Sequence, residues 1–349
     1  RLHRGGCAGR AAGMSVSTLG RRRIGEAARE VAISRGMAIT LALAGVWGGL
    51  FAMLSVARHE AFWTARFDLG NMVQAIWSTA QLRPLESTSG AGDQITRFAA
   101  HVDPLLAVYT PIYAIWPDPR SLLVAQSVAI ASGAIPAYWL ARRWVGDDDL
   151  ALIGPAAYLL YPTLQWAVVT DLHAVTLAAP LLMFAIWAAD ADRLGWLIAF
   201  STLALLSKEQ VGIAVMGLGI WVAFRYRRRL IGGAIAVAGA VWTIVAIAVI
   251  IPSAAVSDES PLAGRYSELG DSPAAAVGAL LSRPWEANAI AADNGGAEYH
   301  AGLLLPLAML PHAAPLLVLD ADPQIAINQL SDWPAQRTIE IHYASVIVT

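Results

Sequence analysis

Five short polar motifs separate the long apolar stretches of this chain, and they contain the residues that could do chemistry. The motifs are "RFD" at 66–68, "HVD" at 101–103, "TDLH" at 170–173, "SKEQ" at 207–210 and "EIHY" at 340–343. Carboxylates and histidines can accept or donate protons in a reaction, and a lysine can stabilise negative charge that develops on a leaving group. These residues therefore favour acid–base chemistry assisted by a cation.

The candidate catalytic residues are Asp68, Lys208 and Glu209. Lys208 and Glu209 interrupt nearly continuous apolar sequence, where a charge costs roughly 2.5–3.5 kcal/mol on membrane-insertion scales, so we expect a partner or a ligand there. The candidate substrate-binding residues are Arg66, His101, Asp171, His173, His342 and Tyr343. The functional hypothesis requires that these separate segments converge, and no single residue carries it alone.

Each motif also has a purely structural interpretation. Asp is a favoured residue at helix N-termini, so Asp68 could cap a helix that begins at Leu69. The second motif could be a turn before Pro104, and residues 170–173 could be a turn at the membrane interface. Lys208 and Glu209 could neutralise each other as an ion pair. These alternatives remain open at the level of the sequence.

A divalent cation such as Mg or Mn is a further hypothesis with a weak signal. Asp68, Asp171 and His101 could supply the oxygen and nitrogen ligands, but they come from distant segments without a diagnostic spacing. The single cysteine, Cys7, excludes an intrachain disulfide and a cysteine-based metal site. The net charge of -2 gives no reason to expect nucleic acid as a partner.

The segments between the motifs have the composition of membrane-spanning helices. The 349 residues are 57% hydrophobic and 14% charged, and the mean hydropathy is +0.53. A span needs about 20 mostly apolar residues, because the hydrocarbon core is about 30 Å thick. We therefore expect an all-α, polytopic transmembrane bundle of about eight or nine spans, at 37–57, 121–141, 150–168, 174–190, 194–207, 209–224, 230–251, 301–311 and 313–330.

Basic residues set the expected orientation. Arginines cluster at 21–35, 141–144 and 225–229, and such clusters usually face the cytoplasm. We therefore expect residues 1–36 to be a cytoplasmic N-terminal segment and residues 37–349 to form a multi-span domain of an integral membrane protein. With this orientation all five polar motifs lie on the outer face.

Two long connections also lie outside in this topology. The first extracytoplasmic loop is 58–120, in which prolines break the apolar stretch 104–117 into interfacial helices, and the second is 252–300. The last residues, "HYASVIVT", open a new apolar stretch. We therefore expect the C-terminus to be truncated relative to a longer protein.

Several blocks of the sequence resemble the domain of unknown function 2079 family, a set of predicted polytopic membrane proteins of bacteria and archaea. The blocks are "FDLGNMVQAIW", "HVDPLLAVYTPIYAIWPDPRSLLVAQ", "YLLYPTLQWAVVTDLHAVTLAAPLL", "SKEQVGIAVMGLGI" and "IHY", within about residues 40–345. This family in turn looks like a member of the C-type (GT-C) glycosyltransferases. The resemblance implies transfer of a sugar from a polyprenyl-phosphate carrier to an acceptor on the outer face of the lipid bilayer.

The resemblance also implies roles for individual residues. The acid of the first outer loop falls on Asp68, which would take the proton of the acceptor hydroxyl. Lys208, helped by Arg66 or Arg97, would stabilise the phosphate leaving group, and Glu209 would orient Lys208. The family's Asp-x-His block falls on Asp171 and His173, and its His-x-x-Pro block begins at His101. One departure is that Leu69 follows Asp68 where many GT-C loops carry two adjacent acids.

Two other classes of protein are alternatives. A non-catalytic relative with the same fold would need no converging polar residues. A secondary transporter would place its charges in the middle of broken spans and would show internal repeats. The sequence shows no such repeat, and its charges fall near the ends of the apolar stretches.

Overall fold

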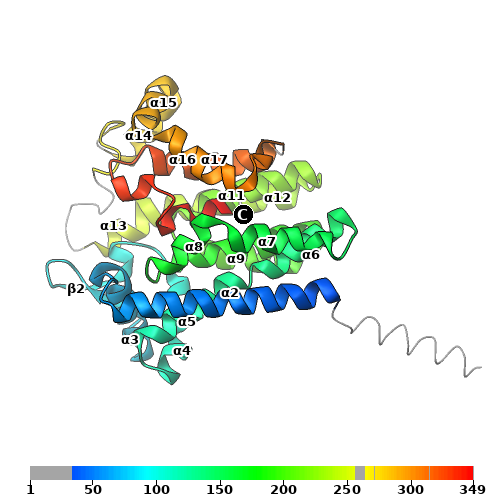
Figure 1. Ribbon diagram of the computed structural model, residues 1–349. Helices are drawn as coiled ribbons and strands as arrows, with labels where there is room; N and C mark the ends of the chain where they lie inside the picture. The colour runs from blue at the N-terminus through cyan, green and yellow to red at the C-terminus, as the bar shows by residue number, and fades with distance from the viewer. Residues whose placement is uncertain (1–33, 256–263, 271, 314, 349) are drawn as a thin grey trace, which may run out of the picture.

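The computed structural model describes residues 34–255, 264–270, 272–313 and 315–348, and this part of the chain is mostly helical (Figure 1). The expectation of an α-helical fold is thereby confirmed. The N-cap residue of the long helix α2 (Arg35–Glu60) is Ser34, whose hydroxyl accepts a hydrogen bond from the Met37 amide at 3.2 Å. It packs along α5 (Pro119–Ala131) and α6 (Ala134–Val145).

Further helices complete the bundle. Their bounds are α7 (Ile153–Leu160), α8 (Pro162–Val169), α9 (Ala178–Asp190), α10 (Leu194–Leu205), α11 (Val211–Arg225) and α12 (Arg229–Val245). The chain bends by 44° between α7 and α8. The cause is local, because Tyr161 precedes Pro162 and adopts the extended conformation that a following proline favours.

Helices α11 and α12 form a closely packed hairpin. Gly212 and Gly219 of α11 face Gly239 and Gly232 of α12, and a Cβ atom at any of these positions would clash with the backbone of the opposite helix. Small residues at such spacing let two helix backbones approach within membranes. The hairpin fixes the start of α11 at Val211, two residues after Glu209 in the chain.

Smaller elements fill the two long connections. The first contains η1 (Arg66–Gly70), α3 (Asn71–Ala80), a hairpin of β1 (Glu86–Thr88) and β2 (Gln94–Thr96), η2 (Arg97–Ala99), η3 (Pro104–Tyr109) and α4 (Thr110–Ile115). The strands pair antiparallel with Ser87 opposite Ile95, a hairpin that the hydropathy pattern did not indicate. The second contains α13 (Ile251–Ala254), α14 (Pro273–Ser282) and α15 (Pro284–Asp293).

The remaining elements are short turns and the C-terminal helices. They are η4 (Leu150–Leu152), η5 (Ala174–Leu177), η6 (Ala246–Ile250), α16 (Gly296–Leu304), η7 (Leu305–Leu307), η8 (Leu310–Ala313), α17 (Pro315–Gln329), η9 (Pro334–Arg337) and η10 (His342–Val348). The expected span 301–311 is divided among α16 and two 3-10 turns. The expected span 313–330 corresponds to α17, which contains Pro323 and the exposed Asp322.

Three helical segments in the described part are long and apolar enough to cross a membrane: Arg35–Glu60, Pro119–Val145 and Arg229–Ala254. The bent pair α7 and α8 adds a fourth if it counts as one span. The expected number of about eight or nine is not confirmed, because helices such as Leu194–Leu205 are only 12 residues long. At 1.5 Å per residue such a helix covers about 18 Å of a core about 30 Å thick.

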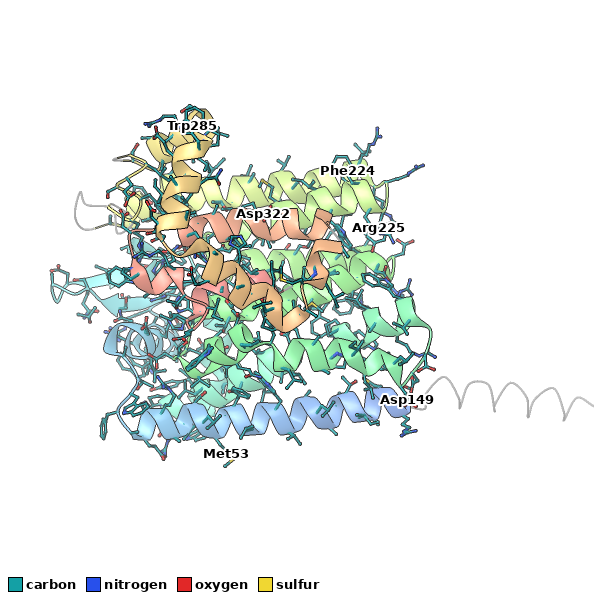
Figure 2. All side chains as sticks on the ribbon, turned by 45° about the horizontal axis from the view of Figure 1, so that its top comes forward. Met53, Asp149, Phe224, Arg225, Trp285 and Asp322 are labelled. Carbon is teal, nitrogen blue, oxygen red and sulfur yellow. The ribbon has the colours of Figure 1, made fainter. Side chains whose placement is uncertain are left out.

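The connections between the helices gather at two opposite ends of the bundle (Figures 1 and 2). At one end Arg35 lies 3.8 Å from Asp149, and Arg143 lies 2.6 Å from Asp190. Figure 2 places Asp149 and Arg225 at this end, so the described basic segments do meet there. The polar motifs lie at the other end, which we call the motif end. Residues 1–33, including Cys7, lie outside the described residues.

Candidate functional site

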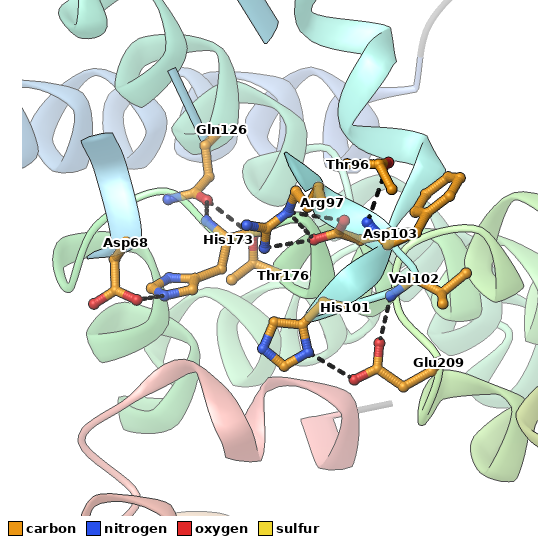
Figure 3. Close-up of polar contacts among 11 residues, drawn as sticks. Asp68, Thr96, Arg97, His101, Val102, Asp103, Gln126, His173, Thr176 and Glu209 are labelled. Atoms are coloured by element: carbon orange, nitrogen blue, oxygen red, sulfur yellow. Dashed lines mark hydrogen bonds and ion pairs between the residues drawn. The ribbon is translucent and has the colours of Figure 1, made fainter. Parts of the chain in front are cut away.

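Four of the polar motifs approach one another at the motif end (Figure 3). Asp68 Oδ1 lies 3.3 Å from His173 Nε2, which joins the first connection to the loop after α8. His101 Nδ1 lies 2.9 Å from Glu209 Oε1, which joins the same connection to the loop before α11. The convergence that the functional hypothesis requires is therefore present for these residues.

Asp68 lies in the π-helical turn η1, directly before α3. Gly70, and not Asp68, is the N-cap residue of α3. The capping interpretation of Asp68 is therefore wrong. The contact with His173 lowers the pKa of Asp68, with help from the charges of Lys208 and Arg97, although partial burial acts in the opposite direction. Asp68 is thus an ionised carboxylate with 46% of its side chain exposed, and it can accept a proton.

The side chain of Gln126, on α5, forms hydrogen bonds that fix the loop that carries His173. The Gln126 side chain donates to the Asp171 carbonyl at 2.8 Å and accepts from the His173 amide at 2.9 Å and the Thr176 hydroxyl at 3.0 Å. Gln126 is fully buried. It was not among the residues that the sequence singled out, although a lone glutamine in the apolar run 121–131 is a signal that could have identified it.

Asp171 connects the same loop to the segment after α2. Its Oδ2 accepts a hydrogen bond from the Ala65 amide at 2.9 Å, and its backbone has φ of 99°, a conformation that costs energy for a residue other than glycine. Burial raises the pKa of Asp171 to about 6, and the charge of Asp68 adds to this. Asp171 therefore shapes the loop that presents His173, as the turn interpretation of residues 170–173 proposed.

Glu209 contacts the second motif and not Lys208. Its Oε1 binds His101, and its Oε2 accepts a hydrogen bond from the Val102 amide at 3.0 Å. Burial would raise the pKa of Glu209, but His101 and Lys208 lower it to about 2. The expectation that Glu209 orients Lys208 through an ion pair is wrong, because both carboxylate oxygens are engaged by the 101–102 segment.

Lys208 is buried, and among the described residues it forms no ion pair within 4.0 Å. Burial lowers its pKa, although Glu209 and Asp103 act in the opposite direction. Its Nζ lies 5.7 Å from the centre of the Tyr343 ring. Because it is buried with no carboxylate at contact distance among the described residues, Lys208 is a candidate to bind an anionic ligand.

The last described element, η10, brings His342 and Tyr343 to the site. The His342 ring stacks on His173 with 3.5 Å between the ring centroids and 21° between the planes, and Tyr343 follows at 4.2 Å from His342. Burial lowers the pKa of both histidines. The stacked rings are therefore neutral, and together with Asp68 and Lys208 they form a continuous row of contacts, which we call the ring row.

Arg97 is not available for the phosphate role that was considered for it. Its guanidinium binds the Asp103 carboxylate through Nε at 2.8 Å and Nη2 at 2.7 Å, and both side chains are buried. The pair fixes the connection between β2 and η3. The side chain of Arg66 lies outside the described residues.

The expected ligands of a divalent cation are not brought together as a set. Among the described residues, no group of three His, Cys, Asp or Glu side chains is arranged to hold a metal ion. Asp171 is turned toward the Ala65 amide and His101 toward Glu209, while Asp68 faces His173. The arrangement gives the hypothesis of a Mg or Mn site no support.

The surface of the helices identifies the class of protein. Val46 and Met53 on α2 are 72% and 71% exposed, and Figure 2 shows Met53 pointing away from the bundle. Large exposed apolar faces on long helices are typical of an integral membrane protein, and in this one the ionisable residues of the polar motifs gather at one end of the bundle. A family model described as "Predicted membrane protein (DUF2079)" matches residues 58–349, so the chain belongs to this family. Comparisons with curated proteins and with solved structures found no match.

Proposed function

We propose that this protein is a membrane glycosyltransferase with a GT-C-like bundle, which moves a sugar from a polyprenyl-phosphate carrier to an acceptor hydroxyl. The observation that carries the proposal is the ring row. It has an ionised, half-exposed carboxylate, Asp68, at one end of neutral rings, and at the other end a buried lysine, Lys208, which has no ion-pair partner among the residues that the structure describes. Sugar transfer from a lipid phosphate needs both groups. The carboxylate takes the proton from the attacking hydroxyl oxygen, and the cation stabilises the phosphate oxygen that leaves.

The proposed step is a single displacement at the anomeric carbon. Asp68 accepts the proton of the acceptor hydroxyl, and the oxygen of that hydroxyl forms the new glycosidic bond to the anomeric carbon. The bond between the anomeric carbon and the phosphate oxygen breaks, and its electron pair stays on the polyprenyl phosphate. Lys208 stabilises that negative charge as it develops. His173 positions Asp68, and Glu209 positions His101 at the edge of the site.

The orientation of the protein in the membrane belongs to the same proposal. Clusters of arginine usually face the cytoplasm, so the end with Arg35, Arg143 and Arg225 is cytoplasmic, as is the N-terminus. The motif end then faces the outside of the bacterial plasma membrane, where the carrier presents its sugar. Shorter apolar helices such as α9, α10 and α11 complete the polytopic bundle alongside the three long segments.

The location of the charges favours an enzyme over a transporter. Asp68, Lys208 and Glu209 lie in connections outside the segments that are long enough to span a membrane. A transporter places such residues near the middle of its spans. A site at the end of the bundle suits a lipid-linked donor that stays in the membrane and an acceptor that arrives from water.

The test is a sugar-transfer assay in membranes with a radiolabelled polyprenyl-phosphate sugar. Asp68→Asn and Lys208→Met keep the size of each side chain and remove its charge, and each should lower transfer by about 10²–10⁴-fold. Asp93→Asn, in the exposed turn between β1 and β2, is the matched control and should leave transfer unchanged. Equal incorporation by all four proteins would remove the enzymatic proposal.

A further inference from the structure

The turn between α11 and α12 is rich in arginine and lies at the end of the bundle opposite the motif end. Four of the five residues 225–229 are arginines, and we call this segment the arginine turn. Figure 2 places Phe224 and Arg225 at this end. The segment Arg229–Ala254, which is long and apolar enough to cross a membrane, begins at the turn. The arginines therefore lie at the level where the hydrocarbon of a bilayer gives way to its headgroups.

Two contacts with the end of α9 fix the arginine turn. The Tyr226 hydroxyl donates to Asp190 Oδ1 at 3.0 Å, and Arg228 forms an ion pair with Asp192 in the turn between α9 and α10. The three exposed arginines of the segment are Arg225, Arg227 and Arg229. No carboxylate among the described residues lies within 4.0 Å of these three. The turn therefore presents three positive charges, without ion-pair partners in the described part of the chain, from a fixed backbone.

Two of these arginines occupy positions that are unfavourable for the fold itself. Arg227 has φ of 55°, a left-handed conformation that glycine or asparagine adopts more readily than arginine. Arg229 is the first residue of α12, where its charge meets the positive end of the helix dipole, and the first turn of α12 contains no acidic residue. An anionic ligand would offset both costs, and backbone strain of this kind often accompanies a functional site.

Exposed apolar side chains flank the arginine turn on both helices. Phe224 at the end of α11 is 71% exposed, and Leu230 at the start of α12 is 91% exposed. Val237 and Val241 of α12 are also exposed, and their spacing places them on the same face of the helix as Leu230. Positive charge next to an exposed apolar stripe matches a phospholipid with an anionic headgroup, whose acyl chains would lie along the helix.

We infer that the arginine turn binds an anionic phospholipid, with the headgroup phosphate at Arg225, Arg227 and Arg229 and the acyl chains along the exposed face of α12. A zwitterionic headgroup carries its own cation, which the three arginines would repel, so charge selects the anionic lipid. The usual preference of arginines for one side of a membrane accounts for their number. It does not account for a strained arginine at 227 or a cation at the start of a helix. The inference does not rest on the proposed sugar transfer, which takes place at the other end of the bundle.

The experiment measures binding of radiolabelled phosphatidylglycerol to the full chain in detergent micelles. The test variant combines Arg227→Asn with Arg229→Gln, which removes two charges, and it should weaken binding by roughly tenfold or more. Its thermal midpoint without added lipid should equal or exceed that of the wild type, because asparagine tolerates the left-handed conformation and glutamine does not oppose the helix dipole. Weaker binding without weaker folding separates a lost ligand contact from a damaged structure.

The matched control combines Arg83→Gln with Arg283→Gln at the motif end. Each of these arginines forms an ion pair with a glutamate three residues later in the chain, Glu86 or Glu286. The control therefore loses the same net charge as the test variant, at a distance from the arginine turn. It should bind phosphatidylglycerol like the wild type.

Three results would overturn the inference. The first is equal affinity of the test variant and the control for phosphatidylglycerol. The second is equal binding of phosphatidylglycerol and phosphatidylcholine by the wild type. The third is competition by water-soluble glycerol phosphate that is as strong as competition by the lipid, because the site would then bind a free anion and make no use of the apolar stripe.

A second measurement on the wild type does not depend on the substitutions. Phosphatidylglycerol that carries a photoreactive group near its phosphate should label peptides that contain residues 224–230. Labelling confined to peptides from the first connection, residues 61–118, would contradict the inference.

Discussion

The charged residues of the site are held apart by neutral ones. Asp68 touches His173, His173 stacks on His342, and Tyr343 stands between His342 and Lys208. If Asp68 and Lys208 formed a direct ion pair, neither would be free for a substrate. The ring row therefore keeps a proton acceptor and a cation in one site without mutual neutralisation.

The raised pKa of Asp171 leads us to expect that the thermal stability of the protein depends on pH. Burial raises its pKa from the ordinary value of 3.8 to about 6, so the folded state favours the protonated form. The stabilisation from this proton is complete below about pH 4 and is lost as the pH rises through about 6. Asp171→Asn should raise the thermal midpoint at pH 7 by roughly 2–4 °C, and the gain should vanish near pH 4.

The Asn variant also keeps an oxygen for the Ala65 amide, and asparagine tolerates a positive φ better than most residues. The measurement is a series of thermal unfolding curves in detergent between pH 4 and 7. If the difference in thermal midpoint between the wild type and the variant is the same at pH 4 and at pH 7, Asp171 does not bind a proton on folding.

Gln126 leads to a prediction about the loop that presents His173. Gln126→Met should destabilise the protein by about 3 kcal/mol, because the Asp171 carbonyl and the His173 amide would be left buried without their partner. Denaturant unfolding checks this value. Ser127→Ala is the control. Ser127 is equally buried, but its hydroxyl donates to the Leu123 carbonyl within its own helix, so its loss should cost less than about 1 kcal/mol. Similar losses in both variants would contradict the role of Gln126.

At the scale of elements, the α11–α12 hairpin positions Lys208 through its tight helix contact. Gly219→Ala should destabilise the protein by roughly 1–3 kcal/mol, since its Cβ would meet the backbone of Ala236. Gly233→Ala meets nothing within 4 Å and should be neutral or stabilising by up to about 1 kcal/mol. The yield of folded protein after mild heating distinguishes the two variants, and equal yields would argue against close packing.

The sequence predicted the helical class, and it singled out polar residues that the structure brings close together, because charged residues within apolar sequence are conspicuous. It could not predict the partners of those residues. Glu209 lies next to Lys208 in the chain, yet it binds His101, because the loop before α11 turns its side chain toward the first connection. The position of Gln126 in an apolar run marks it as unusual, but the sequence could not show what it binds, since its partners lie more than 40 residues away. Span lengths were overestimated where prolines and short turns end helices early.

At the scale of the whole molecule, the two ends of the bundle predict sidedness. Cysteine placed at Asp93 should react with a membrane-impermeant reagent from outside, and cysteine at Asp149 should not, in a chain whose Cys7 has been replaced. Both positions are exposed, so access to water is not limiting. A cysteine at position 68 should react from the same side as one at position 93. Reaction of positions 68 and 149 from a common side would exclude the proposed orientation.

The stacking of His342 on His173 also makes the far C-terminal part of the chain a component of the site. The segment from residue 340 onward supplies one of the two imidazoles and the phenol above Lys208. A protein cut at residue 339 would keep Asp68, His173 and Lys208 and lose the two rings that lie between His173 and Lys208. The proposed site would therefore be complete only in a chain in which residues 342 and 343 have docked against the loop after α8, so its assembly depends on contacts between segments far apart in the sequence.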